Sequence, residues 1–570
     1  MAESGHIIVC GMGDIGYRVV ELLHRLGERV VVITQAARDE RLQTAAAAGV
    51  RVLLGDARNE RLLVEAGLAG ARAVIAATDR DLVNLEAVLD AHRLRPGVPA
   101  VVRLFDQSLA RQLETSFDLR RALGMSALAA PNFAAAALGD SVLASFMADG
   151  VPFVVGREGV GQGPLRDGAR VGDIARVHGL LPLARERPGG ACTPLPDHAA
   201  DMQAGDHLTL LARKADWERL FGPPAAPAAR VPLRHRLWRA AGRLRAAWRD
   251  EPFPLRALLV GLAIVLPLTV ALFHLYLDLS LTEAVFHTVT NLYGDIKLTD
   301  TRPEIQIYEL LLLVLGSLIV ATLYSLITDA LIASRLRKIL GDRPMPPGGH
   351  VVVVGLGHIG YRVVGELLGL GVPVVTVDAD ADGERSFVTA VRQLAPVVIG
   401  DARLEETLAR AGLATARAVV AATGDDAVNL GIGLAAKRMN PRARTVVRLF
   451  DADLARKVEK ALAIDAALGA ARIAAPTFAA SALYPDVIKA FLVGDLLLVL
   501  LQRPAGPAWD GQTPAELRER EDVQILQRGG RLVAGDDARP LESGEEVLAA
   551  LWRPVAPAWS TAPPLLAAGG

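Results

Sequence analysis

The chain of 570 residues predicts an α/β fold that occurs in two copies, with an all-α membrane segment between them. Three observations predict this arrangement: a long internal repeat, a glycine-rich motif that opens each copy, and two long apolar stretches between the copies. The 62 basic and 63 acidic residues nearly balance, so bulk charge gives no argument for nucleic-acid binding. Only two cysteines occur, Cys10 and Cys192, which favours a reducing compartment over a disulfide framework.

The internal repeat consists of five matching segments in the same order. Residues 6–19 (HIIVCGMGDIGYRV) match residues 350–363 (HVVVVGLGHIGYRV), 344 positions further along the chain. The later matches, at a spacing of 345, pair LLGDAR with VIGDAR, AATDRDLVNL with AATGDDAVNL, VVRLFD with its second occurrence, and APNFAAAAL with APTFAASAL. A period this long indicates duplication of a whole domain rather than a solenoid.

Each copy opens with an apolar run, the pattern Gly-x-Gly-x-x-Gly and a helical pattern, which together predict a Rossmann-like fold. The first glycine permits a tight turn, the second lets a phosphate approach the backbone, and the third lets the helix pack on the sheet. The N-terminus of that helix presents unpaired N–H groups to a pyrophosphate. The predicted phosphate-binding residues are Gly11, Gly13, Asp14, Ile15 and Gly16 in the first copy, and Gly355, Gly357, His358, Ile359 and Gly360 in the second.

The end of the second predicted strand distinguishes the two copies. In the second copy it carries Asp378, 18 residues after the last glycine, where a carboxylate accepts hydrogen bonds from ribose hydroxyls. The first copy has Thr34 and Gln35 there, and an amide binds a ribose less strongly. We therefore expect the second copy to bind NAD(H) or an adenine nucleotide in the more typical way. The alternative, for either copy, is that the glycines serve packing alone.

Further polar residues follow the third and fourth predicted strands of each copy. They are Asp56 and Asp401 in the two GDAR segments, and Thr78, Asp79, Thr423 and Asp425 after the next strand. Such strand ends line the crevice of a doubly wound sheet, so these residues either contact a ligand or cap the helix that follows.

The repeat and the changes in composition predict the domain boundaries. The sequence predicts Rossmann-like lobes at 1–140 and 341–485, small α+β lobes at 141–221 and 486–555, a linker with a basic amphipathic helix at 222–254, a membrane segment at 255–340, and a disordered tail at 556–570.

The apolar stretches at 257–276 and 310–327 are each long enough to span a bilayer. They lie within predicted helices at 256–277 and 308–338. The flanking segments are rich in arginine, whereas the loop between the spans is acidic, so the positive-inside rule places both termini in the cytoplasm.

The loop between the two spans predicts a pore element. Residues 281–290 (LTEAVFHTVT) predict a short amphipathic helix that re-enters the membrane, and residues 291–296 predict irregular backbone after it. Irregular backbone at membrane depth is tolerated only inside protein or against a water-filled cavity, where carbonyls replace the hydration shell of an ion. The alternative is a simple extracellular hairpin between two anchors.

With these motifs the chain resembles a tetrameric cation channel of the potassium-channel superfamily, which has an outer helix, a pore helix, a filter and an inner helix. Its paired α/β domains resemble RCK domains (regulators of potassium conductance). The resemblance implies a pore helix and filter at 281–296. The filter consists of Thr290, Asn291, Leu292, Tyr293, Gly294 and Asp295, matched to the family pattern Thr-Val-Gly-Tyr-Gly-Asp. Leu292 replaces a flexible glycine of that pattern, which leaves a less selective cation pore open. Gly316 in the second span is either an inner-helix hinge or a close-packing site.

The sequence therefore favours a ligand-gated cation channel in the inner membrane, with potassium as the expected ion. The resemblance implies a homotetramer in the lipid bilayer, with a cytoplasmic ring of RCK domains that senses a nucleotide and moves the inner helices. The alternative is a non-conducting, membrane-anchored NAD-binding regulatory subunit of a potassium transporter.

Enzymatic and metal-dependent functions have weaker support. An NAD-dependent oxidoreductase is disfavoured because the 11 histidines are scattered and His358 is poorly placed for hydride chemistry. No cluster of His, Cys or acidic residues has metal-ligand spacing, although a divalent ion held between ring units stays open.

Overall fold

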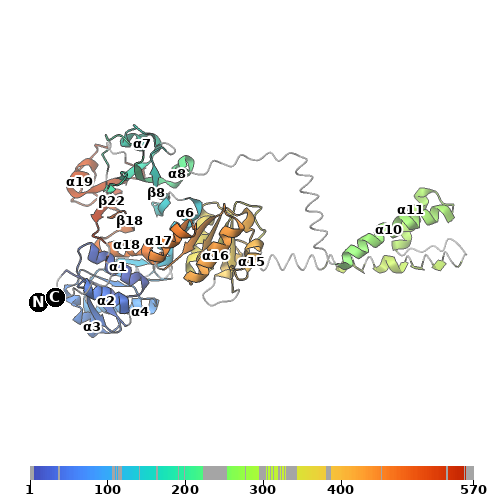
Figure 1. Cartoon of the computed structure of the whole chain (residues 1–570), viewed down its shortest axis with the longest axis horizontal. Coiled ribbons are helices and arrows are strands. Elements are labelled where there is room, and N and C mark those ends of the chain that lie inside the picture. The colour runs from blue at the N-terminus through green and yellow to red at the C-terminus, as the bar shows by residue number, and fades with distance from the viewer. Residues whose placement is uncertain are drawn as a thin grey trace, which may run out of the picture. The chain divides into compact units, whose positions relative to one another are not determined.

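The computed structural model describes most of the chain, which forms two compact units (Figure 1). Unit 1 comprises Met1–Gly222 with Asp342–Gly570, and unit 2 comprises Pro223–Gly341. The described residues are 5–35, 39–105, 110, 112, 119–139, 142–161, 165–190, 192–194, 196–197, 199–221, 253–276, 278–293, 303, 306–307, 310–311, 313–318, 321–322, 324–325, 328, 343–380, 387–450, 452–533, 537–557 and 559.

The first copy begins with a Rossmann-like lobe around a parallel sheet of six strands, in the order β3-β2-β1-β4-β5-β6. Its central strands are continuous apolar runs because helices cover both faces of a parallel sheet. The strands are β1 (Ile7–Cys10), β2 (Val30–Thr34), β3 (Arg51–Leu54), β4 (Ala73–Ala76), β5 (Ala100–Arg103) and β6 (Arg121–Leu123). The helices are α1 (Asp14–Arg25), α2 (Asp39–Ala47), α3 (Glu60–Glu65), the 3-10 helix η1 (Leu68–Gly70), α4 (Asp81–Leu94) and α6 (Met125–Leu138).

The second copy repeats this lobe with the order β14-β13-β12-β15-β16-β17. The predicted Rossmann-like fold is therefore confirmed for both copies. Its strands are β12 (Val351–Val354), β13 (Val374–Asp378), β14 (Val397–Ile399), β15 (Ala418–Ala421), β16 (Arg444–Arg448) and β17 (Ala466–Leu468). Its helices are α13 (His358–Gly369), α14 (Val388–Arg392), α15 (Glu405–Arg410), η2 (Leu413–Thr415), α16 (Asp426–Met439), α17 (Ala452–Ala461) and α18 (Ala470–Leu483).

A smaller lobe with an antiparallel five-stranded sheet follows each Rossmann-like lobe. The first contains β7 (Val142–Ala148), β8 (Val151–Gly159), α7 (Val171–His178), β9 (Leu181–Glu186), β10 (Cys192–Pro194), β11 (His207–Arg213) and α8 (Lys214–Phe221). The second contains β18 (Val487–Val493), β19 (Leu496–Pro504), α19 (Pro514–Glu521), β20 (Val523–Arg528), β21 (Arg531–Leu532) and β22 (Glu546–Pro554). One core joins the two sheets, in which Phe146 and Phe153 cluster with Phe491 and Trp552.

The two copies exchange their last Rossmann-lobe helices. Helix α6 of the first copy packs against α13 of the second, α18 of the second packs against α1 of the first, and α6 and α18 also contact each other. Both helices are rich in alanine and apolar on all sides, as a helix buried on every face must be. Phe133 and Phe478 are fully buried, and truncating such a ring to alanine typically costs about 3–5 kcal/mol. The exchange therefore makes each lobe depend on the other for its core.

Cationic side chains hold the carbonyls at the C-terminal ends of the exchanged helices. Arg444 donates through Nε to the carbonyl of Ala136 in α6. Arg120 donates to the carbonyl of Ala482 in α18, at 3.0 Å. Cations stabilise helix C-termini, where the last carbonyls lack partners within the helix and carry partial negative charge.

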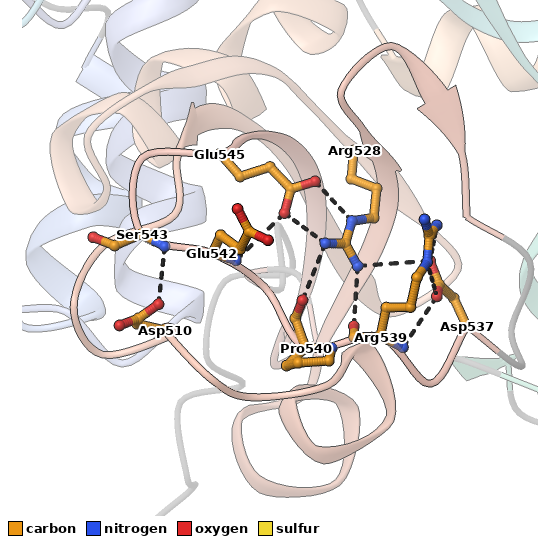
Figure 2. A network of polar contacts seen from close by, with 8 residues as sticks. All are labelled: Asp510, Arg528, Asp537, Arg539, Pro540, Glu542, Ser543 and Glu545. Carbon is orange, nitrogen blue, oxygen red and sulfur yellow. Dashed lines mark hydrogen bonds and ion pairs between the residues drawn. The ribbon is translucent and has the colours of Figure 1, made fainter.

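An arginine in each smaller lobe fixes the loop before the last long strand. In the second lobe, Arg528 donates through Nε and Nη2 to the two carboxylate oxygens of Glu545, each at 2.7 Å, and also binds the carbonyls of Arg539 and Pro540 (Figure 2). In the first lobe, Arg185 donates through Nε and Nη2 to one carboxylate oxygen of Asp206, Oδ2, and also to the carbonyl of Asp201. This repeated contact was not singled out in the sequence, although both partners recur in both copies.

Unit 2 contains α10 (Phe253–Tyr276) and α11 (Leu281–Tyr293), which pack together through Phe273 and Ala284. The side chains of α10 are described over 263–275. No helix within the described ranges combines the length and the apolar character that a bilayer crossing requires. Large apolar side chains are nevertheless more than half exposed in this unit: Ile264, Leu268, Leu275, Phe286, Leu310, Leu311, Val314 and Leu318.

Helix α11 extends further than the sequence predicts. Irregular backbone was expected from residue 291, but the helix continues through Tyr293, so Thr290, Asn291, Leu292 and Tyr293 are helical. The Thr290 hydroxyl donates back to the carbonyl of Phe286, a bond that satisfies the hydroxyl within the helix. The prediction of irregular backbone is therefore wrong for 291–293. Gly294 and Asp295 lie outside the described residues, and Gly316 is a buried helical residue.

The expected disorder of the C-terminal tail is also wrong at its start. Ala556 donates to the carbonyl of Arg25 at 3.0 Å and accepts from Arg25 Nε at 2.7 Å. Trp559 packs against the first core, beside Tyr17. The composition of the tail, rich in Pro and Ala, concealed this aromatic anchor.

Lys489 on β18 is a buried lysine at the crossing of the exchanged helices. It is 3% exposed, and its ammonium donates to the carbonyl of Leu128 in α6 at 2.6 Å. Burial lowers the pKa of Lys489 to about 8, against the attraction of Glu366 on α13. Burial raises the pKa of Glu366, which also faces Arg362 and Lys214. The first copy has Ala144 and Leu22 at the matching positions, so only one side of the crossing carries this charge.

This burial predicts a pH-dependent stability. The folded state binds fewer protons than the unfolded state between the lowered pKa near 8 and the ordinary lysine value, so stability rises with pH in that window. Between pH 7.5 and 9.5 the wild type should gain roughly 1–2 kcal/mol relative to Lys489→Met, measured by chemical denaturation. Lys457→Met, at an exposed position of α17, serves as the control and should show no such change. A pH-independent difference between wild type and Lys489→Met would contradict the assignment.

Candidate functional site

The candidate sites are two crevices at the carboxyl ends of the parallel strands, where the strand order reverses between β1 and β4 and between β12 and β15. Ligands of doubly wound sheets bind at this switch point. In the second copy the crevice is a cavity of about 430 Å³. It brings together six predicted residues: Gly355, Gly357, Asp378, Asp401, Thr423 and Asp425. We refer to the two sites as the first crevice and the second crevice.

The three glycines of each motif have different physical requirements. Gly11 and Gly355 adopt φ values of +103° and +86°, and a side chain there would also press on the backbone of the threonine that follows β4 or β15. A Cβ on Gly16 would overlap the carbonyl oxygen of Gly11, and a Cβ on Gly360 that of Gly355. The third glycine thus lets the helix start close against its own turn, rather than against the sheet alone.

The middle glycines leave open space for a ligand. Nothing lies within 4 Å of a Cβ built on Gly13 or Gly357. Both residues are N-caps without a side-chain cap, so the first N–H groups of α1 and α13 have no capping partner from these residues. Ile15 and Ile359 are buried in the cores, so only their backbone is available to a ligand. This is the arrangement of an anion site at a helix N-terminus.

The first residue of each helix has a different environment in the two copies. In the second copy, the ring of His358 stacks on Phe105 of the first copy, with centroids 5.0 Å apart, and packs against Phe387. In the first copy, Asp14 forms an ion pair with Arg41 of α2 at 2.6 Å. One phosphate-binding turn is therefore bordered by an imidazole and the other by a carboxylate.

The residues at the end of the second strand also differ. The carboxylate of Asp378 accepts from the backbone N–H of Leu356 at 2.6 Å and from that of Asp380 at 3.0 Å, so it is fixed beside the glycine turn. Gln35 instead donates to Asp56 at 2.7 Å and accepts from Arg80 at 3.3 Å. In the first copy, the side-chain amide of Gln35 is already hydrogen-bonded within its own lobe. In the second copy, Asp378 lines the cavity.

The aspartates of the GDAR segments each bind an arginine two residues further on. Asp56 accepts from the backbone and guanidinium of Arg58, and Asp401 accepts in the same way from Arg403. These hydrogen bonds lower the pKa of both carboxyl groups, which keeps them ionised. They do not cap the following helix; in the first copy Asn59 caps α3. The arginines were missed, although the repeated GDAR segment carries them.

The threonines after the fourth strands turn inward. Thr78 donates through its backbone and hydroxyl to the buried Asn84, and Thr423 does the same to Asn429. Asp425 caps α16 by accepting from the N–H of Val428 at 2.9 Å, which favours the capping interpretation for this residue. Asp425 also lines the cavity of the second crevice.

A second pair of residues missed in the sequence lies at the end of the fifth strand. Arg103 and Arg448 donate to the carbonyls of Thr78 and Thr423, and both lie within the repeated VVRLFD segment. The charges of Asp79 and Asp14 oppose the effect of burial on the pKa of Arg103, and Asp14 also acts on Arg448 of the other copy. Asp14 of the first copy therefore interacts electrostatically with an arginine of the second copy.

Metal binding has no support among the described residues. Within those ranges, no group of three or more His, Cys, Asp or Glu side chains is arranged to hold a metal ion.

Comparison with known proteins agrees with this geometry. The TrkA-N domain model matches residues 7–119 and 351–469, which are the two Rossmann-like lobes. The Trk system potassium uptake protein TrkA of Mycobacterium tuberculosis is 29% identical over 202 residues, which are 35% of this chain and 90% of that protein. Potassium channel protein 1 of Methanocaldococcus jannaschii is 27% identical over 157 residues, which are 27% of this chain and 46% of that protein.

Solved structures show the same fold. The GsuK channel superposes with a TM-score of 0.53 at 16% identity, over 96% of this chain and 77% of that one. The isolated GsuK RCK domain superposes with a TM-score of 0.52 at 16% identity, over 96% of this chain and 92% of that one. The TrkA-N domain model thus matches both Rossmann-like lobes, and the chain shares the fold of these solved structures.

Proposed function

We propose that the chain is a subunit of a potassium-conducting cation channel of the inner membrane, gated by a nucleotide. The observation that carries this proposal is the order of the parts along the sequence: a region that matches the TrkA-N model precedes the unit that exposes large apolar side chains, and a second such region follows it. A solvent-exposed apolar surface of this kind is normally covered by lipid or by another subunit. A homotetramer in a bilayer accounts for both coverings.

The proposed effector is NAD(H) or an adenine nucleotide in the second crevice. Its cavity has a glycine turn open to phosphate and a carboxylate, Asp378, beside that turn. One of the similar structures is a GsuK channel bound to NAD, with a TM-score of 0.51 at 16% identity. For the first crevice, where Gln35 and Asp14 replace the acid and the imidazole, we propose weaker binding.

The proposed ion path lies at the end of α11. The last four carbonyls of a helix lack partners within it, and its C-terminus carries partial negative charge, which suits a cation. In α11 these are the carbonyls of residues 290–293, next to Gly294 and Asp295. Because the helix ends at Tyr293, only these carbonyls and those of the next residues are available for ion sites, which favours moderate selectivity.

The proposed coupling runs through the exchanged helices. A nucleotide at the turn before α13 contacts the helix on which α6 of the first copy packs, so it biases both copies together. A ligand moves such an equilibrium only by binding one arrangement better, and coupling of about 1–3 kcal/mol is typical. We propose that the segment after the inner helix transmits this change to that helix, which bends at Gly316.

The alternative function is a non-conducting regulatory subunit anchored in the membrane. One observation favours it: the match to the potassium uptake protein of Mycobacterium tuberculosis spans 90% of that protein but only 35% of this chain. A regulator would use unit 2 to bind the transporter. Catalysis is part of neither proposal.

Replacing the middle glycines tests the nucleotide site. Gly357→Asp places a carboxylate in the open space of the second turn, where it repels phosphate, and aspartate is also a good N-cap. We expect at least a tenfold loss of NADH affinity by calorimetry, with thermal stability unchanged or slightly higher. The matched control Gly13→Asp alters only the first turn and should leave the tight binding event in place. Loss of the same event in both variants would contradict the assignment to the second crevice.

Flux into lipid vesicles tests the conducting function. Reconstituted protein should pass K⁺ faster than Na⁺, and NADH should change the rate. Asp295→Asn removes a carboxylate beside the proposed path, so K⁺ flux at low salt should fall roughly twofold to fivefold. Asp300→Asn, in the same loop but further from Tyr293, is the control and should have a smaller effect. Protein that binds NADH but passes no monovalent cation would favour the regulatory subunit.

A further inference from the structure

The C-terminal segment of the chain docks on α1, the helix that begins at the first phosphate-binding turn. Ala556 and Arg25 exchange two hydrogen bonds, of 3.0 and 2.7 Å. Trp559 donates through Nε1 to His24 Nδ1 at 3.1 Å, and its ring meets that of Tyr17 edge-on, with centroids 5.9 Å apart. Residues more than 530 positions apart in the sequence are thus held together on one helix face.

The contacts continue from Trp559 to the turn itself. The guanidinium of Arg41 lies over the ring of Tyr17, 5.5 Å from its centroid. Arg41 in turn pairs with Asp14 at 2.6 Å, and its side chain is only 22% exposed. Asp14 is the first residue of α1 and follows the N-cap Gly13 directly. Trp559, Tyr17, Arg41 and Asp14 therefore form one continuous row of contacts.

The second copy supplies the matching aromatic ring from its own lobe. Tyr361, which corresponds to Tyr17, stacks on Phe387 at 4.7 Å, and Phe387 donates its N–H to the carbonyl of Leu356 in the glycine turn. In the first copy, the segment after the second strand, residues 35–50, contains no aromatic residue. The C-terminal Trp559 provides an aromatic neighbour for the tyrosine of the first copy.

The charge at this position decides whether the turn accepts an anion. A carboxylate beside the helix N-terminus repels a phosphate that approaches the same N–H groups, unless a cation neutralises it. Arg41 is that cation, and Tyr17 provides the surface on which its guanidinium rests. Loss of the packing at Trp559 would free Tyr17 and Arg41 to adopt other rotamers, which would expose the charge of Asp14.

We propose that the C-terminal segment controls the affinity of the first crevice for phosphate-bearing ligands, because Trp559 positions Arg41 to neutralise Asp14. This inference rests on the proposed nucleotide-sensing function and extends it to the crevice that lacks the ribose-binding acid. Trp559, Tyr17 and Arg41 are positioning residues in this account.

A double-mutant cycle in the full-length chain tests the proposal. The experiments use the Gly357→Asp background, so that ADP titrates the first crevice alone, and they measure ADP affinity by calorimetry. Trp559→Ala should weaken ADP binding about twofold to fivefold, the range expected for loss of a partly exposed charge contact. Trp559→Phe keeps a ring against Tyr17 and should retain most of the affinity. Arg41→Gln should reproduce the effect of Trp559→Ala, and the two changes together should not add.

The decisive arm removes the carboxylate. In an Asp14→Asn background, Trp559→Ala should no longer change ADP affinity, because no charge remains to be neutralised. An equal effect of Trp559→Ala in both backgrounds, or no effect in either, overturns the proposal. Failure of the Gly357→Asp protein to bind ADP also overturns it, whereas failure of the wild type to bind any nucleotide would contradict the proposed function itself.

Discussion

The packing of α6 and α18 across the two copies is the constraint on which the rest of unit 1 depends. Each helix belongs to one Rossmann-like lobe by sequence and fills the core of the other: Phe133 lies in the second core and Phe478 in the first. Arginines from elsewhere in the chain bind carbonyls at the C-terminal end of each of the two helices. The lobes therefore cannot separate without exposing two alanine-rich apolar helices. Each crevice lies above a core to which both copies contribute.

The two copies share this framework and differ mainly in the residues that line the crevices. The residues that hold the frame recur, as in the arginine–carboxylate pairs of the smaller lobes and the Thr–Asn–Arg sets beneath the crevices. The residues that would contact a nucleotide differ: Asp378 and His358 in the second copy stand against Gln35 and Asp14 in the first. Such a division suits one principal sensing site and one modulating site within a single gating element, as we propose.

Much of this fold could be predicted from the sequence, because its signals are local. The glycine motifs, the apolar strands and the 344-residue repeat predicted both Rossmann-like lobes and the six residues that meet in the second cavity. The exchange of helices could not be predicted, since a helix that is apolar on all sides indicates burial but not its partner. Trp559 was missed for a similar reason: one aromatic residue in a tail gives no periodic pattern. In unit 2, the run from Thr290 to Tyr293 has no helix breaker, so α11 continues through Tyr293.

The central claim, that ligand in one crevice acts on both copies through the exchanged helices, is tested most directly by amide hydrogen exchange of the full-length chain with and without NADH. Peptides from the second phosphate-binding turn should become protected, and so should α6, which lies on α13 although it belongs to the first copy. Protection confined to residues 351–469, with α6 unchanged, would contradict the account.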